Sequence, residues 1–312
     1  MDSPQVVSIG EALVDVISEA GQPTREVPGG SPANVALTLS RLGRRTLMHA
    51  WLADDARGQA VAAHLRASGV EISPESWGAT RTPTAAAAVD EEGHATYEFD
   101  LEWAPRAPLP IPAGTGIVHA GSIGAVLRPG ATAVEDAMSR AMDTALVTFD
   151  PNVRPTIMRD QGLTVAAFDG PLAHADLIKV SDEDIDWMRG NRTREAVIED
   201  WIAAGVNVII MTAGKDGARA WSASGCEVHV PADGSVVVED TVGAGDSFMG
   251  GILDQMITEG LSGAAARDTL FAISADTLER LLRRGARVAD VTVSRVGANP
   301  PTSADLGEGE GN

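Results

Sequence analysis

The second half of the chain alternates short apolar runs with stretches of helical periodicity, and this alternation constrains the fold more than any other feature of the sequence. Strand-like runs lie at 117–120, 147–150, 177–180 and 208–212, and helical spacing is found at 131–141 and 194–204. Apolar strands separated by helices form a mostly parallel sheet that is covered on both faces. Ligands bind such sheets beyond the carboxyl ends of the strands. The sequence therefore predicts an α/β three-layer sandwich with its site along one sheet edge.

Two predicted hairpins interrupt this alternation. Their strands lie at 12–17 and 24–28, around a turn at 19–23, and at 80–89 and 95–103, around a turn at 90–94. Each hairpin would expose an apolar face unless it covered another part of the chain. Tyr97, Phe99 and Trp103 are candidates for such a covering face, with burial in the core as the alternative.

The segment 240–248 reads DTVGAGDSF and predicts phosphoryl transfer. Gly243, Ala244 and Gly245 stand between a β-branched run at 236–238 and an apolar helical stretch, so we expect a strand that turns sharply into a helix. The first N–H groups of a helix lack internal partners and stabilise an anion such as phosphate. Asp246 would repel that anion, but it fits as the base that takes a proton from an attacking hydroxyl. Capping of the helix is the alternative role.

A second tight entry into a buried helix lies at 29–36, with the sequence GGSPANVA. Paired glycines and a proline precede a run of apolar residues. Asn34 is the polar exception, and a buried amide needs partners, which either the protein or a sugar hydroxyl could supply.

Composition excludes several classes of function. The net charge of −20 opposes nucleic-acid binding. The longest uncharged apolar stretches are far too short for a membrane span, and the start MDSPQ lacks the features of a signal peptide, so a cytoplasmic protein without membrane contact is expected. The single cysteine, Cys226, cannot form an internal disulfide and is not expected to be a nucleophile.

The two glycine turns together resemble the two signatures of the PfkB, or ribokinase-like, carbohydrate kinase family. The resemblance extends through GEALVDVIS near the N-terminus, FDPNVRP at 149–155, IKVSDEDI at 178–185, TAGKDGA at 212–218 and SRVGANPPT at 294–302. The order and spacing of these segments agree with the fructokinase-like branch. The resemblance implies a ribokinase-like sandwich with a main domain of 1–10, 29–79 and 104–302 and a β-lid of 11–28 and 80–103. The last residues, 303–312, are poor in apolar side chains and are expected to be a disordered tail.

The resemblance also implies roles for individual residues. Asp246 matches the general base, and Gly243, Ala244 and Gly245 form the anion hole. The implied sugar-binding residues are Asp15, Gly29, Gly30, Asn34, Tyr97 and Arg154, and the implied nucleotide-binding residues are Lys179, Ser181, Thr212, Gly214 and Gly217. A monovalent-cation loop is implied at Asp240, Val242, Arg295 and Gly297. Many members carry Asn and Glu where this chain has Ser181 and Asp184, the residue expected near Mg²⁺ through water, and some carry Ser at Pro301.

ATP, Mg²⁺ and K⁺ are therefore the expected cofactors, and a homodimer through the lid is the expected assembly. We expect an ATP-dependent fructokinase that forms fructose 6-phosphate. A 2-keto-3-deoxygluconate kinase is the alternative, because Arg154 could pair with a substrate carboxylate, although the acidic strand YEFDLEWAP disfavours an acid sugar. A catalytically silent sugar or nucleotide sensor and an NAD-dependent oxidoreductase are more remote, since Asp246 is present and GEALVDV lacks the dinucleotide glycines.

Overall fold

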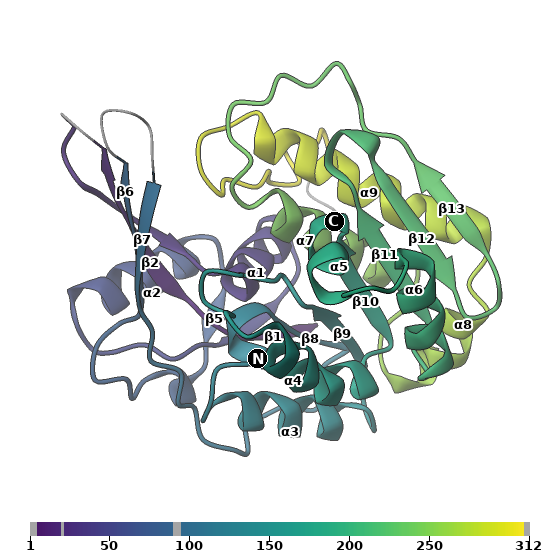
Figure 1. The fold of residues 1–312 in the computed structure, drawn as a ribbon, viewed down its shortest axis with the longest axis horizontal. Coiled ribbons are helices and arrows are strands. Elements are labelled where there is room, and N and C mark those ends of the chain that lie inside the picture. Colours follow the sequence, from purple (N-terminus) through teal and green to yellow (C-terminus); the bar gives the residue numbers. More distant parts are fainter. Residues whose placement is uncertain (1–4, 20–21, 90–94, 309–312) are drawn as a thin grey trace.

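The computed structural model describes residues 5–19, 22–89 and 95–308 and divides the strands between two sheets (Figure 1). The larger sheet has the order β13-β12-β11-β10-β9-β8-β1-β4-β5, made of β1 Val6–Ile9, β4 Thr46–His49, β5 Glu71–Ile72, β8 Ile117–Gly121, β9 Leu146–Asp150, β10 Leu177–Ser181, β11 Val208–Thr212, β12 Ala218–Ser222 and β13 Glu227–Val230. The pairs from β5 to β11 are parallel, and β12 and β13 are antiparallel additions at one edge. The predicted mostly parallel sheet is confirmed.

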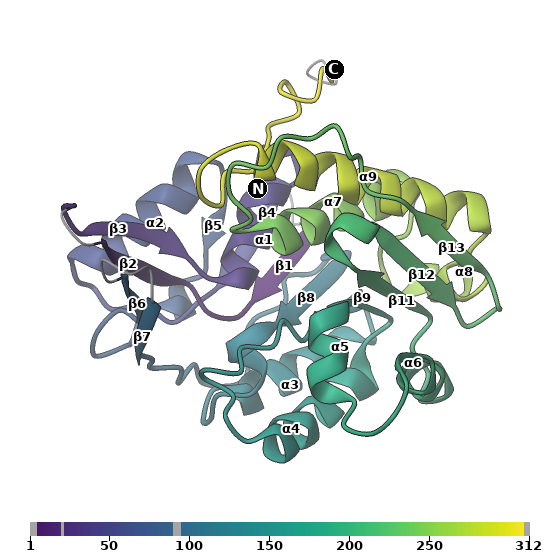
Figure 2. The ribbon, with the colours of Figure 1, turned by 45° about the horizontal axis from the view of Figure 1, so that its top comes forward.

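Helices cover both faces of this sheet. They are α1 Ser31–Arg41, α2 Ala56–Ala67, α3 Ala131–Ala141, α4 Gln161–His174, α5 Asp182–Met188, α6 Arg194–Ala203, α7 Ala244–Thr258, α8 Arg267–Phe271 and α9 Ala275–Val293, with short 3₁₀ turns that include η2 Ser122–Ala125 and η3 Gly214–Asp216. In Figure 2, α1, α7 and α9 lie on one face, and α3 to α6 lie on the other. A separate apolar cluster fills the space on each side, so the sheet strands are buried from both faces.

The smaller sheet projects from the body of the molecule (Figure 1) and contains β2 Leu13–Glu19, β3 Arg25–Gly29, β6 Thr84–Val89 and β7 Ala95–Asp100 in the order β3-β2-β6-β7. The two predicted hairpins are therefore present, and β2 and β6 join them by parallel pairing. The predicted turns at 19–23 and 90–94 fall partly and wholly outside the described residues. Trp103 belongs to the main core rather than to a covering face, because it is buried and packs against Gly130.

Two expectations from the sequence are wrong. Residues 236–238 form no strand, since Val237 and Val238 are 79% and 58% exposed and their segment crosses the surface before α7. Residues 303–308 are not a free tail, because Leu306 is buried against Leu42 and Val288, and Glu308 is paired with Arg284. One apolar side chain and an ion pair thus connect this short segment to α9; residues 309–312 lie outside the described part of the chain.

Candidate active site

Asp246 lies where α1 and α7 meet, and donors from α1 bind both of its carboxylate oxygens. The hydroxyl of Ser31 donates to Oδ1 at 2.7 Å, and the side-chain amide of Asn34 donates to Oδ2 at 2.8 Å. Asp246 is 7% exposed, and both side chains that bind its carboxylate are polar. The structure thus joins the two glycine turns, although more than 200 residues separate them in the sequence.

The N-terminus of α7 has no protein cap. Gly243 occupies the N-cap position with a φ of 76°, a left-handed conformation that favours glycine, and no side chain caps the helix. Within the described part of the chain, the amide N–H groups of Gly245 and Asp246 have no hydrogen-bond partner. Asp246 therefore does not cap its helix, and the predicted pair of open donors is present for an anion.

A buried lysine faces this helix terminus. Lys179, in the middle of β10, is 3% exposed, and a Cβ atom added to Gly245 would lie 2.9 Å from its Nζ atom. The ammonium group donates to Oδ2 of Asp150 at 2.9 Å, at the end of β9. Burial opposes the charge of Lys179, yet the carboxylates of Asp150, Asp184 and Asp246 together raise its pKa. Burial raises the pKa of Asp150 to about 6, and the neighbouring ammonium of Lys179 opposes this shift.

Three of the predicted sugar-binding residues, Asp15, Gly29 and Gly30, lie close to where the chain passes between the two sheets. Asp15 lies on β2, and its Oδ2 atom occupies the space where a side chain at Gly29 would begin, 2.2 Å from the added Cβ atom. Gly30 has a φ of 109°, and a Cβ atom there would lie 2.4 Å from the carbonyl oxygen of Glu11. Both glycines are thus required by close packing. The side chain of Tyr97 lies outside the described part of the structure.

Arg154 follows β9 and has an exposed side chain whose charge acts on two carboxyl groups. Burial raises the pKa of Asp15 to about 6 and that of Glu11 to about 7, and the guanidinium of Arg154 partly opposes both shifts. The predicted Arg154 therefore lies near the predicted Asp15, on the same side of the site.

The predicted nucleotide-binding residues follow neighbouring strands at the same sheet edge. Ser181 and Thr212 are paired at the ends of β10 and β11. Gly214 and Gly217 lie in and after η3, with φ angles of 48° and 86°. Both oxygens of Asp184 accept backbone N–H groups, from Val153 at 3.0 Å and Ser181 at 3.3 Å.

Asp240 links the two loops of the predicted cation site. Its carboxylate accepts the N–H groups of Val242 at 3.0 Å and Gly297 at 2.8 Å. The side chain of Arg295 is paired with Asp305 at 3.3 Å. Among the described residues, no group of three or more His, Cys, Asp or Glu side chains could hold a metal ion.

Sequence reasoning did not single out Glu11 or Ser31. Glu11 is buried at the crossing from β1 to β2, where its Oε2 atom accepts the N–H of Gly124 at 3.0 Å. A charged residue directly after a wholly buried strand was the available signal for Glu11. Ser31 lies inside the quoted GGSPANVA segment, and only the fold shows its contact with Asp246.

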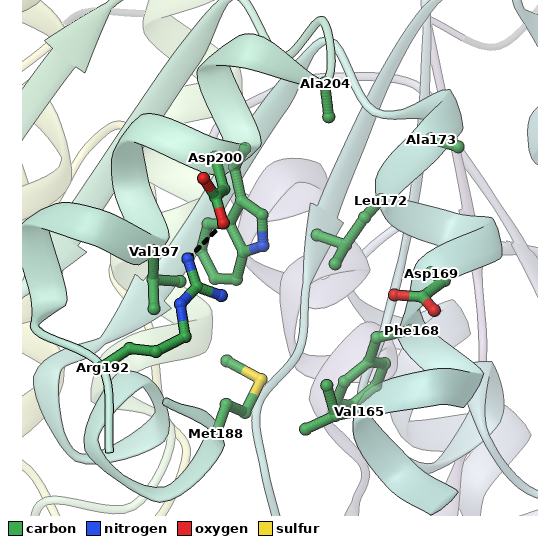
Figure 3. Close-up of a pocket in the computed structure, with 11 residues that line it drawn as sticks. Val165, Phe168, Asp169, Leu172, Ala173, Met188, Arg192, Val197, Asp200 and Ala204 are labelled. Carbon is green, nitrogen blue, oxygen red and sulfur yellow. Dashed lines mark hydrogen bonds and ion pairs between the residues drawn. The ribbon is translucent and has the colours of Figure 1, made fainter. Parts of the chain in front are cut away.

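A hollow of about 290 Å³ lies on the opposite face of the sheet, between α4, α5 and α6 (Figure 3). Phe168, Leu172, Val197 and Trp201 form much of its wall, and an Arg192–Asp200 ion pair lies beside them. None of the predicted site residues lines this hollow. It is therefore separate from the site around Asp246.

Comparison with known proteins agrees with this geometry. The sequence model of the pfkB family carbohydrate kinases matches residues 3–305. A fructokinase of Rhizobium leguminosarum bv. trifolii is 32% identical over 269 residues, covering 82% of this chain and 81% of the relative. A fructokinase of Klebsiella pneumoniae is 31% identical and covers 86% and 88%, respectively.

Solved structures show the same fold. A fructokinase from Xylella fastidiosa with bound ATP superposes with a TM-score of 0.82 at 25% identity, covering 97% of each chain. A double mutant of the Vibrio cholerae O395 fructokinase, with fructose, ADP and potassium bound, has a TM-score of 0.80 at 22% identity and covers 99% of this chain and 100% of that one. In the part of the chain that the structure describes, no helix is long and apolar enough to cross a membrane. The protein belongs to the pfkB family of carbohydrate kinases, which transfer a phosphoryl group to an alcohol.

Proposed function

We propose that this carbohydrate kinase is an ATP-dependent fructokinase that phosphorylates the primary hydroxyl of fructose to give fructose 6-phosphate. Relatives at about 30% identity that cover most of the chain are fructokinases, which supports the choice of sugar. Structures of similar fold hold ATP in one case and fructose with ADP in another. The cytoplasm is the proposed location, and a homodimer through the lid sheet is the proposed assembly.

The observation that carries the proposal is the charge arrangement at the start of α7. A helix N-terminus carries positive partial charge, and the ammonium of Lys179, held in place by Asp150, adds a positive charge beside it. A phosphoryl group bound between Lys179 and the open N–H groups of Gly245 and Asp246 would satisfy both. The site is thus complementary to the charge that develops on a transferring phosphoryl group.

Asp246 would act as the general base. The primary hydroxyl of the sugar attacks the γ-phosphorus, the bond from that phosphorus to the bridging oxygen breaks, and the hydroxyl proton passes to Asp246. Asn34 now donates to Oδ2 of Asp246, and the same amide is the proposed donor to a sugar hydroxyl. The amide carries two N–H groups and Oδ2 retains a second lone pair, so Asn34 could bind the sugar while Oδ2 accepts the proton.

The surroundings of Arg154 support a neutral sugar. Asp15 and Glu11 both lie within range of its charge, so a substrate carboxylate would meet two carboxyl groups around one guanidinium. This favours fructose over 2-keto-3-deoxygluconate. Asp15 and the backbone of Gly29 and Gly30, with Tyr97 from the lid, are the remaining proposed sugar contacts.

The nucleotide would lie along the ends of β10 and β11, with Lys179, Ser181, Thr212, Gly214 and Gly217 as proposed contacts. Exposed valines on the loops joined by Asp240, namely Val238, Val242 and Val296, offer apolar surface for a flat base. The oxygens of Asp184 each accept one N–H group and retain a further lone pair, so Asp184 fits a water ligand of Mg²⁺, which would neutralise phosphate charge. Asp240, Val242, Arg295 and Gly297 are the proposed K⁺ loop.

A coupled assay of ATP consumption over a sugar panel tests this proposal, with fructose and 2-keto-3-deoxygluconate measured side by side. We expect the highest kcat/KM with fructose. A higher kcat/KM with 2-keto-3-deoxygluconate would overturn the choice of sugar. Ligand binding without turnover on any sugar would instead indicate a sensor.

A further inference from the structure

The sequence patterns assigned no role to Glu11 and Ser31. These two residues connect Asp246 with the segments where the chain passes between the two sheets. We propose that Glu11 and Ser31 are positioning residues for the base: Glu11 fixes the start of α1, and Ser31, the first residue of that helix, holds one oxygen of Asp246. The inference rests on the proposed role of Asp246 as the base.

The chain passes between the two sheets at two adjacent places, and Glu11 joins them. The first crossing is 10–12, between β1 and β2, and the second is 29–30, between β3 and α1. Oε1 of Glu11, in the first crossing, accepts the backbone N–H of Ser31, directly after the second, at 3.4 Å. Its Oε2 atom accepts the N–H of Gly124. A buried carboxylate with two amide donors therefore holds both crossings against η2.

Close packing at glycines leaves this junction little freedom to shift. A Cβ atom at Gly10 would lie 2.4 Å from Cγ of Pro32. On the sheet side, the hydroxyl of Ser8 donates to the carbonyl oxygen of Pro32 at 2.8 Å. The first turn of α1 is thus fixed to β1 as well as to Glu11, which makes it a rigid support for its side chains.

Ser31 uses its two donors in different directions. Its backbone N–H binds Glu11, and its hydroxyl binds Oδ1 of Asp246 at 2.7 Å. Ser31 binds Oδ1, whereas Asn34 binds Oδ2, so each α1 donor fixes a different oxygen of Asp246. The Ser31 hydroxyl keeps the carboxylate in one rotamer, with Oδ2 toward the reacting hydroxyl.

Ser31→Ala removes only the hydroxyl, and it is the first test. Loss of one hydrogen bond that orients the base should lower kcat about 10-fold on the sugar that gives turnover. KM for the sugar and the dissociation constant for ATP should stay within about 2-fold, because the substrate contacts are unchanged. Ser40→Ala is the matched control, since Ser40 lies on the same helix and its buried hydroxyl has no partner among the described residues. The control should keep the kcat of the wild type.

A double-mutant cycle with Glu11→Gln tests the connection between the two residues. If Glu11 acts on Asp246 through Ser31, then Glu11→Gln lowers kcat in the wild-type background and has little further effect on kcat in Ser31→Ala. A purely structural role of Glu11 would lower kcat by the same factor in both backgrounds, and that result would overturn the connection. Should Glu11→Gln fail to fold, Ser31→Ala still decides the role of the hydroxyl.

A kcat for Ser31→Ala equal to that of Ser40→Ala would overturn the inference. Asp246→Asn separates this failure from a failure of the proposed function. If Asp246→Asn abolishes turnover while Ser31→Ala keeps it, only the positioning role is wrong. If Asp246→Asn retains turnover, the base itself is wrongly assigned, and the role of Ser31 fails with it.

Discussion

The N-termini of α1 and α7 have the same backbone design and opposite electrostatic surroundings. Each helix follows a glycine with positive φ, Gly30 or Gly243, and neither has a side-chain cap from its N-cap residue. The first amide of α1 is bound by the carboxylate of Glu11. The corresponding end of α7 faces the ammonium of Lys179 and has open N–H groups.

We infer that this difference separates a structural helix terminus from a binding one. A buried carboxylate completes the start of α1 within the protein, so α1 needs no ligand there. At the start of α7, Asp150 pairs with the ammonium of Lys179, but within the described residues no protein group accepts the N–H groups of Gly245 and Asp246. A glycine turn by itself therefore does not identify a phosphate site; we propose that open N–H groups beside a lysine do.

Of the changes that test this comparison, removal of Lys179 should have the largest effect on stability and turnover. Lys179→Met leaves Asp150 buried without its cation, and breaking such a pair destabilises a protein by about 3–5 kcal/mol. Denaturant unfolding measures the loss, and a coupled assay should show strongly reduced turnover. The double variant Lys179→Met/Asp150→Asn should recover stability but not turnover. Recovery of turnover as well would show that Lys179 serves only to neutralise Asp150.

Adding one methyl group at each helix terminus should sharpen the comparison. Gly30→Ala is strained by its φ of 109° and by the carbonyl oxygen of Glu11, so we expect a loss of about 3 kcal/mol in unfolding free energy. Gly245→Ala meets only the flexible end of Lys179, and its stability should stay within about 1 kcal/mol of the wild type. Its turnover should nevertheless fall about 10-fold, because the methyl group enters the anion site. Equal effects on stability at both positions would contradict the distinction.

The smallest expected effect is on the pH dependence of the unfolding free energy, through Glu11 beside the start of α1. Burial raises the pKa of Glu11 from 4.5 to about 7 in the folded state, so the folded protein binds a proton that the unfolded chain has released between these values. Stability relative to Glu11→Gln should therefore fall as pH rises from 5 to 8, by about 2 kcal/mol. Urea unfolding of both proteins at several pH values measures this difference. Glu71→Gln, at an exposed position of β5, is the control, and a parallel pH profile for Glu11→Gln and the wild type would disprove the prediction.

Local sequence patterns were sufficient for most of the sheet and for both glycine turns. The apolar run 208–212 and the helical pattern 131–141 coincide with β11 and α3, because a buried strand or an amphipathic helix is encoded by its own residues. The prediction of a strand at 236–238 was wrong for the same reason: β-branched residues favour strands, but among the residues that the structure describes no strand pairs with these valines. Strand formation there depends on tertiary context.

The site was predicted less completely than the fold. Asp246, Asn34 and the glycines carry their signal in short segments, whereas the contacts of Ser31 and Lys179 arise only when distant segments pack together. The sequence therefore indicated Asp246 and Asn34, which the fold brings into contact, and their roles stay predictions. It did not indicate that α1 would occupy both oxygens of Asp246, or that Lys179 would face the start of α7.

The most direct test of the central claim is the turnover of Asp246→Asn, measured together with its affinity for ATP by calorimetry. The substitution removes the proton acceptor and leaves the N–H groups of α7 in place. We expect kcat to fall at least ~100-fold while the dissociation constant for ATP changes less than about 3-fold. A kcat close to that of the wild type would contradict the assignment of Asp246 as the base.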